Sequence, residues 1–163
     1  MKGLIVVFVL GGILFIGSSC AKQETFSEYD SEKRALNLQD SFDYDYKEKK
    51  RFTQNELLAD VKLSGIDTVW ELDCSTSDFL DINYHSENKA GEFKVILVKP
   101  NHKVETLFEN TDKGTKKKKM PAGKNYIRII GNQSDAAFGI KYQVGKQTKI
   151  IMNQVKDNYQ AQN

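Results

Sequence analysis

From about Leu57 onward, the chain consists of short runs in which apolar and polar residues alternate. Trp70, Leu72 and Cys74 fall on one side of such a run, with acidic residues between them. Alternation with a period of two is typical of a β-strand with one buried face. The same pattern recurs at residues 80–84, 104–108 and 138–144, and residues 126–130 form a strongly β-prone run. We therefore predict a series of strands, with Trp70 and Cys74 in the core and little helix between them.

Turn signals separate these runs. Residues 86–91 and Pro100-Asn101 flank the run 93–98, in which Ile96 and Val98 make both faces apolar, as expected of a central strand. Without intervening helices, parallel crossovers are disfavoured. The prediction is an all-β fold, an antiparallel two-sheet β-sandwich of immunoglobulin-like or jelly-roll-like type, with a small barrel as the alternative. This order of turns and strands resembles the β-sandwich modules of secreted bacterial proteins, a resemblance that assigns no functional residue.

Shorter segments around these runs predict further elements. A short helix is predicted within residues 27–38. Phe42, Tyr44 and Tyr46 alternate with acidic residues, which predicts a first edge strand. Residues 116–120 predict another edge strand, and residues 148–152 a last strand.

The first 19 residues differ from the rest, because they are mainly apolar and Lys2 is their only charge. The apolar run is too short for a bilayer, which needs about 20 residues. A basic start, an apolar stretch and a small-residue end are typical of a secretory signal peptide. The segment ends Ile16-Gly17-Ser18-Ser19-Cys20, which resembles the lipobox of bacterial lipoproteins, although Gly17 stands where that family usually has an aliphatic residue.

The resemblance implies that Cys20 is lipidated and becomes the first residue of the mature chain. Several acyl chains would then anchor the protein stably to a membrane. The implied location is the cell envelope, at the outer face of the cytoplasmic membrane or at the outer membrane. An ordinary cleaved signal peptide, an uncleaved anchor and a Cys20–Cys74 disulfide are the alternatives.

Composition then divides the chain into four parts. Residues 1–19 are the predicted signal peptide, 20–50 a lipid-anchored polar tether, 51–152 the β-sandwich domain and 153–163 a polar tail. The tether is acidic, since residues 24–48 hold eight Asp and Glu against three Lys and Arg. Polar segments without an apolar pattern are typical of linkers.

No catalytic motif is present, and no cofactor or metal is predicted. The protein is therefore predicted not to be an enzyme. His85 falls on the polar face of its strand and His102 lies beside a turn, so both are interpreted as surface residues. A buried thiol has a raised pKa, which argues against nucleophilic use of Cys74. Three acidic residues cluster near one predicted end of the sandwich and leave a calcium site open as an alternative: Asp73, Asp78 and Asp81.

The strongest local charge feature is the run Lys116, Lys117, Lys118, Lys119. Residues 99–124 hold eight lysines against three acidic residues, although the whole chain has a net charge of only +2. This run predicts contact with an anionic polymer, an anionic headgroup or an acidic protein surface. Nucleic acid is not expected, because the protein is predicted to be exported and no aromatic residues interleave the lysines. Solvated lysines that protect an edge strand, and pairing of the run with the acidic tether, are the alternatives.

The sequence thus predicts a membrane-anchored extracytoplasmic lipoprotein with a non-enzymatic binding or envelope-structural role. Two alternatives stay open. One is a small envelope hydrolase with a carboxylate pair or a metal, which requires acidic or histidine side chains converging in a concave site. The other is an inhibitor or regulatory partner of another envelope protein.

Overall fold

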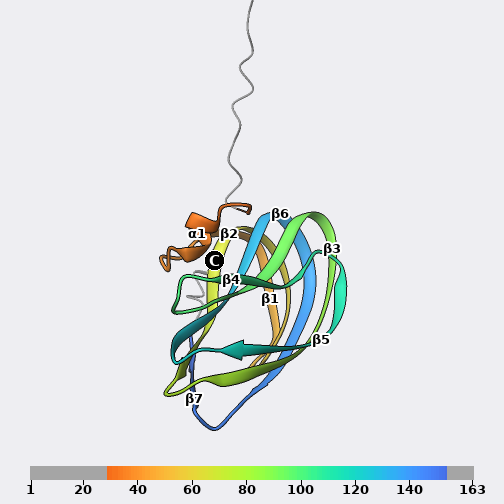
Figure 1. Cartoon of the computed structure of the whole chain (residues 1–163). Helices are drawn as coiled ribbons and strands as arrows, with labels where there is room; N and C mark the ends of the chain where they lie inside the picture. The colour runs from red at the N-terminus through yellow and green to blue at the C-terminus, as the bar shows by residue number, and fades with distance from the viewer. Residues whose placement is uncertain (1–28, 154–163) are drawn as a thin grey trace, which may run out of the picture.

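The computed structural model describes residues 29–153, which form one short helix and seven strands (Figure 1). Every strand pairing in this part of the chain is antiparallel. The elements are α1 (Glu32–Leu36), β1 (Ser41–Phe52), β2 (Glu56–Cys74), β3 (Asp78–Val98), β4 (Val104–Glu109), β5 (Asp112–Met120), β6 (Gly123–Val144) and β7 (Thr148–Met152).

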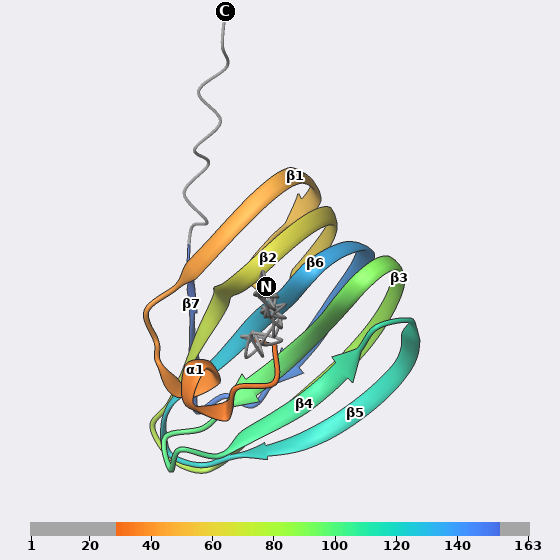
Figure 2. The same ribbon diagram turned by 90° about the horizontal axis from the view of Figure 1, so that it is seen from above.

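The seven strands belong to one hydrogen-bonded sheet with the order β1-β2-β6-β3-β4. In addition, β5 pairs with the first half of β3, and β7 pairs with the second half of β2. Figure 2 shows the long strands lying side by side, each arching over in its middle. The sheet is therefore folded back on itself.

The fold-back occurs where glycine relieves steric conflict in the long strands. Gly65 in β2 has φ 113° and Gly91 in β3 has φ 62°, backbone conformations that favour glycine. The register also shifts around these positions, at β-bulges, and bulges increase strand bending. The bends divide the sheet into two layers. Layer A contains β4, β7 and residues 66–74, 92–98 and 123–131; layer B contains most of β1, all of β5 and residues 56–63, 78–88 and 134–144.

The main hydrophobic core fills the space between the two layers. Trp70 from layer A is fully buried, and its ring meets the Tyr142 ring of layer B edge-on at 5.0 Å between centroids. Cys74 is buried as well. The predictions that Trp70 and Cys74 are core residues are confirmed.

A second, smaller cluster lies on the outer face of layer A. Ile66, Ile96 and Ile130 point outward there and are covered by Tyr29 and Ala35 of the N-terminal segment. This explains why the run 93–98 is apolar on both faces: one side meets layer B and the other meets the segment around α1.

The predicted boundary between tether and domain is wrong. Within residues 20–50, those from Tyr29 onward belong to the fold, as α1, its flanks and the edge strand β1. Tyr29 and Ala35 bury apolar surface that the acidic composition of this stretch conceals. The predicted helix and the predicted strands at 42–46 and 148–152 are confirmed. The predicted signal peptide, Cys20, residues 21–28 and residues 154–163 lie outside the described residues.

The all-β antiparallel sandwich is confirmed, with one difference in its construction. The predicted turn at residues 86–91 is the bend of the continuous strand β3, and the two layers are joined through such bends. Glycine and polar residues mark the bend as they would mark a turn, so the local sequence does not separate the two structures.

Candidate functional site: a lysine-bearing sheet face

Strand β5 carries the predicted lysine run, and its alternation splits the run in two. Lys117 and Lys119 are exposed, whereas Lys116 and Lys118 are half-buried and lie opposite the buried Ile82 and Leu80 of β3. Successive residues of a strand point to opposite faces. The four lysines therefore do not form one contact surface.

The inward pair closes the sandwich between β4 and β5. The Lys116 Nζ donates a hydrogen bond to the carbonyl oxygen of Leu107 at 2.5 Å. The Lys118 Nζ lies 3.4 Å from the Glu105 carboxylate, which also accepts a 2.5 Å hydrogen bond from Lys99. The hydrogen bond from Lys99 holds the pKa of Glu105 below its usual value, against the effect of its partial burial. The assignment of Lys116 and Lys118 to a partner surface is thus corrected, because they bind their own chain.

The outward pair belongs to a larger surface on layer B, which we call the lysine face. It consists of Lys113, Lys117 and Lys119 of β5 and Lys141 of β6, all exposed. The Lys117 Nζ lies 4.6 Å from the centroid of the Phe79 ring, a cation–π contact at an exposed site. These side chains form an open surface over β5 and β6 of layer B, with Asp81 of β3 opposite Lys117 on the same face.

A surface hollow of about 770 Å³ lies on layer B beside Lys113. Leu58, Gly139, His85 and Lys113 face one another there on four neighbouring strands, β2, β6, β3 and β5. A Cβ at residue 139 would overlap the imidazole of His85, so the ring lies directly over the backbone of this glycine. Ala137 supplies the next small side chain of the floor. The hollow exists because β6 carries small residues here.

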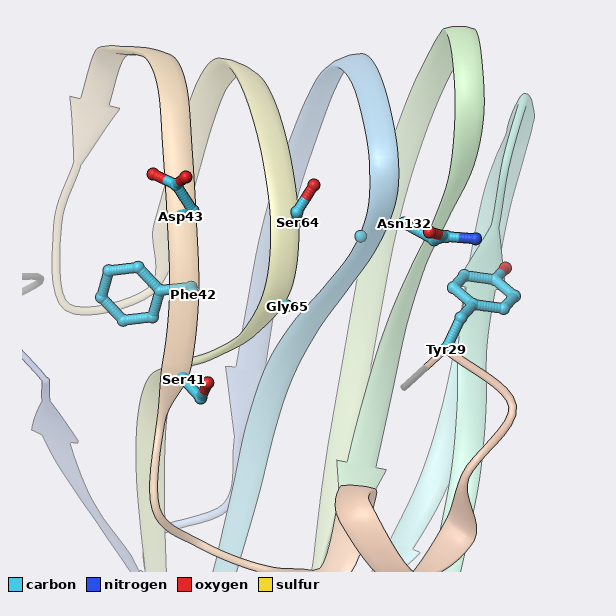
Figure 3. A pocket seen from close by; sticks show the side chains of 8 residues that line it. Tyr29, Ser41, Phe42, Asp43, Ser64, Gly65 and Asn132 are labelled. Carbon is cyan, nitrogen blue, oxygen red and sulfur yellow. The ribbon is translucent and has the colours of Figure 1, made fainter. Parts of the chain in front are cut away.

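A second hollow, of about 380 Å³, lies at the bend (Figure 3). Its floor includes the Cβ-free backbone of Gly65 and Gly131, between Asp43 of β1 on one side and Tyr29 and Asn132 on the other. Burial raises the pKa of Tyr29 to about 12, together with nearby carboxylates. Because the glycines are required for the bend itself, the geometry of the fold accounts for this hollow.

The interior offers no room for a ligand near β1. The space beside Phe52 and Val69 holds only about 10 Å³, room for about one water molecule. At this edge the Tyr44 hydroxyl donates a 2.7 Å hydrogen bond to the buried Asp67, whose carboxylate lies 3.7 Å from the Lys47 ammonium. Burial raises the pKa of Asp67. The sandwich is thus closed by Lys–carboxylate contacts at both of its open edges.

The other candidate side chains lie apart from one another. His85 and His102 are exposed, as predicted; His85 lines the hollow on layer B, and His102 lies in the turn before β4. Within residues 29–153, no group of three or more His, Cys, Asp or Glu side chains is placed to hold a metal ion. The calcium alternative at Asp73, Asp78 and Asp81 therefore gains no support from the structure. Burial raises the pKa of Cys74, whose sulfur lies 3.3 Å from the Thr148 hydroxyl.

The described chain enters the fold next to the bend, and Arg128 fixes it there. The Arg128 side chain is fully buried and donates to the carbonyl oxygens of Ala35 (2.7 Å) and Asn37 (2.8 Å). It also pairs with Asp40 at 3.0 Å and donates to Thr68 at 2.9 Å. The last carbonyls of α1 are satisfied by this guanidinium, so the N-terminal segment is tied firmly to layer A.

Comparison with known proteins gives no family. No family model matches the chain, and no curated protein matches it. Among solved structures, procruciferin, an 11S globulin from Brassica napus, is similar with a TM-score of 0.29 and 13% identity. That likeness covers 60% of this chain and 22% of the globulin, and nothing about function follows from it. Among residues 29–153, no helix is long and apolar enough to cross a membrane.

Sequence reasoning found Lys117 and Lys119 but missed Lys141 and the hollow beside them. Lys141 is far from the lysine run in sequence, and only the pairing of β6 with β3 and of β3 with β5 brings them together. The sequence does contain one indication of the hollow, which is Gly139 within an otherwise regular strand. A glycine in a strand often marks a close approach to another group.

Proposed function

We propose that this protein is a lipid-anchored, extracytoplasmic binding module without enzymatic activity, which presents its lysine face to an anionic polymer of the cell envelope. The observation that supports the proposal most directly is the outward position of Lys117 and Lys119, next to Lys113 and Lys141. Lysine is a flexible point charge, which suits carboxylate or phosphate groups repeated along a chain.

The position of the tether favours a polymer over the anchoring membrane. The Tyr29 hydroxyl lies 3.4 Å from the carbonyl oxygen of Phe93, just past the bend at Gly91. Lys119 pairs with Phe79 at the other end of β3, about 40 Å of strand away. Residues 21–28 span at most about 30 Å when fully extended. An anchor at Cys20 would therefore keep the bend within about 30 Å of the membrane, while the Lys119 end of the lysine face lies at the opposite end of layer B.

The anchor is tested by metabolic labelling with palmitate. The full-length protein is expected to incorporate label and to stay with the membrane fraction. Cys20→Ser removes both properties, whereas Cys74→Ser, the matched control, retains the label because Cys74 is buried in the core. Label on the Cys20→Ser variant, or membrane retention without Cys20, would contradict the proposal.

The lysine face is tested by binding of the full-length protein in neutral detergent micelles to fluorescent polyglutamate. The double variant Lys117→Glu/Lys119→Glu is expected to lose at least about tenfold in affinity, because two charges are reversed. The control is Lys33→Glu/Lys149→Glu, which reverses two exposed lysines elsewhere and should bind within about twofold of wild type.

Anionic phospholipid vesicles and acidic proteins are separate arms of the same experiment. If the lysine face binds vesicles but not polymer, a headgroup is the ligand and the proposal is wrong. Capture of one folded acidic protein, with no binding to polyglutamate, would support the regulatory alternative instead.

A further inference from the structure

The hollow on layer B continues directly into the lysine face. Lys113 belongs to both, and Lys117 follows it on the same side of β5. Same-side residues repeat about every 7 Å along a strand. A ligand seated in the hollow can thus extend along β5 and reach the outward lysines. The volume of about 770 Å³ is within the usual range of small-molecule sites.

The floor of the hollow includes apolar side chains and an aromatic ring. Leu58 and Ala137 line it, and the His85 ring lies over the backbone of Gly139 beside them. Any side chain at residue 139 would displace this ring. The pairing of Gly139 with His85 therefore allows the imidazole to lie against the sheet. Such a floor accepts a flat face of C–H groups.

The rim of the hollow carries hydrogen-bonding groups of both kinds. Two ammonium groups and three carboxylates line it, together with the Thr111 hydroxyl: Lys50, Lys113, Asp60, Glu87 and Asp112. The Asp112 carboxylate already accepts hydrogen bonds from the Tyr84 hydroxyl and the Lys113 N–H. The Lys50 Nζ and the Asp60 carboxylate are 2.7 Å apart and largely neutralise each other. Lys113 then remains against the carboxylates of Glu87 and Asp112, so the hollow suits an uncharged ring that bears several hydroxyl groups better than an anionic one.

We infer that the hollow binds a sugar ring, and that the anionic polymer of the proposed function is an acidic polysaccharide. A pyranose has an apolar C–H face for the floor and hydroxyls around its edge for the rim. Acid groups on the neighbouring sugars of the polymer then meet the lysines along β5. This inference rests on the proposed function for the polymer, while the hollow itself binds sugar independently of the lysines.

The test compares an anionic polypeptide with anionic polysaccharides, and both with neutral oligosaccharides. Full-length protein in neutral detergent micelles is titrated with polyglutamate, with polygalacturonate, alginate and hyaluronate, and with neutral maltotetraose, cellotetraose and chitotetraose. Wild-type protein is expected to bind at least one acidic polysaccharide about tenfold or more tighter than polyglutamate of matched charge. Ala137→Tyr fills the hollow and should abolish that difference without changing polyglutamate binding.

Thr106→Tyr is the matched control, because it places the same ring on an exposed strand position of β4, outside both the hollow and the lysine face. It should bind every polymer as wild type does, and thermal unfolding checks that both variants fold. Equal affinity for polyglutamate and all three polysaccharides, or an advantage that survives Ala137→Tyr, would overturn the sugar inference alone. Binding of a neutral oligosaccharide, sensitive to Ala137→Tyr, with no binding of any polyanion would keep the sugar site and overturn the proposed function.

Discussion

A single buried guanidinium connects the N-terminal segment to the sheet. Arg128 lies on the outer face of layer A and makes hydrogen bonds with the end of α1, with Asp40 and with Thr68. Asp40 in turn accepts hydrogen bonds from the backbone and the side chain of Thr68. Removing the guanidinium would take this donor from the carbonyl oxygens of Ala35 and Asn37, next to an apolar surface, and unpaired buried groups are costly.

We therefore expect Arg128→Met to lower the free energy of unfolding by roughly 3 kcal/mol. Arg51→Met is the control, because Arg51 is mostly exposed and its pairing with Glu56 is a surface interaction worth less than about 1 kcal/mol. Urea denaturation at neutral pH measures both. Equal losses for the two variants would show that the buried network around Arg128 adds no stability.

Glu105 supplies a pH-dependent contact at the edge between β4 and β5. Its folded-state pKa lies below the usual value, mainly because Lys99 donates to it. The stabilisation is therefore present above the unfolded-state pKa of about 4.3 and is lost as the pH falls through the folded-state pKa.

Glu105→Gln is accordingly expected to cost up to about 1 kcal/mol at pH 7, because the contact is partly exposed. The difference from wild type should shrink towards zero as the pH falls below about 4. Urea denaturation along a pH series gives this difference directly. A cost that is the same at pH 7 and pH 3 would mean that the charge of Glu105 is not involved.

At the scale of elements, the bends in the long strands decide the architecture. Gly65 has a positive φ, and a Cβ at this position would overlap the carbonyl oxygen of Ser41 in β1. Both the backbone conformation and this steric overlap therefore disfavour any other residue at position 65. The bend of β2 depends on this position more than on the apolar pattern of either half.

Gly65→Ala is expected to destabilise the protein by at least about 2 kcal/mol. Gly114→Ala is the control within β5, because its φ is ordinary and the nearest atom to an added Cβ is the Tyr84 hydroxyl at 3.2 Å. It should stay within about 1 kcal/mol of wild type. Thermal unfolding that ranks the two variants the other way would contradict this account of the bend.

Most strands could be predicted from alternation, but their length and connection could not. The runs around Leu80 and Phe93 are both visible in the sequence, yet they form one strand because Gly91 bends the chain without ending the ladder. Similarly, residues 29–50 look like a linker, since their acidic side chains hide the few apolar contacts of Tyr29 and Ala35. These features depend on long-range pairing, which local patterns do not specify.

The candidate site shows the same limit. The lysine run identified β5, and the strand period determines that Lys117 and Lys119 face the opposite way from Lys116 and Lys118. The sequence alone does not say which pair faces out. The contacts of the inward pair with Leu107 and Glu105 decide it, and those partners come from β4.

For the whole molecule, the fold separates Tyr29, where the described chain begins, from the Lys119 end of the lysine face. The described chain begins at the bend, where Tyr29 packs, and the lysine face runs to the opposite end of layer B. Binding to a polyanion through such exposed charges should weaken as salt rises, because solvent-exposed charges are screened. The proposed polymer binding thus has a defined contact surface and a defined salt dependence.

The most direct test of polymer binding at the lysine face is lysine footprinting. The full-length protein is treated with an acetylating reagent, with and without polygalacturonate. Mass spectrometry should show protection of Lys113, Lys117, Lys119 and Lys141 by the polymer, and protection should fade at high salt. Lys33 and Lys149, exposed elsewhere, should react at unchanged rates. Uniform protection of all exposed lysines, or protection confined to residues outside the lysine face, would contradict the proposed function.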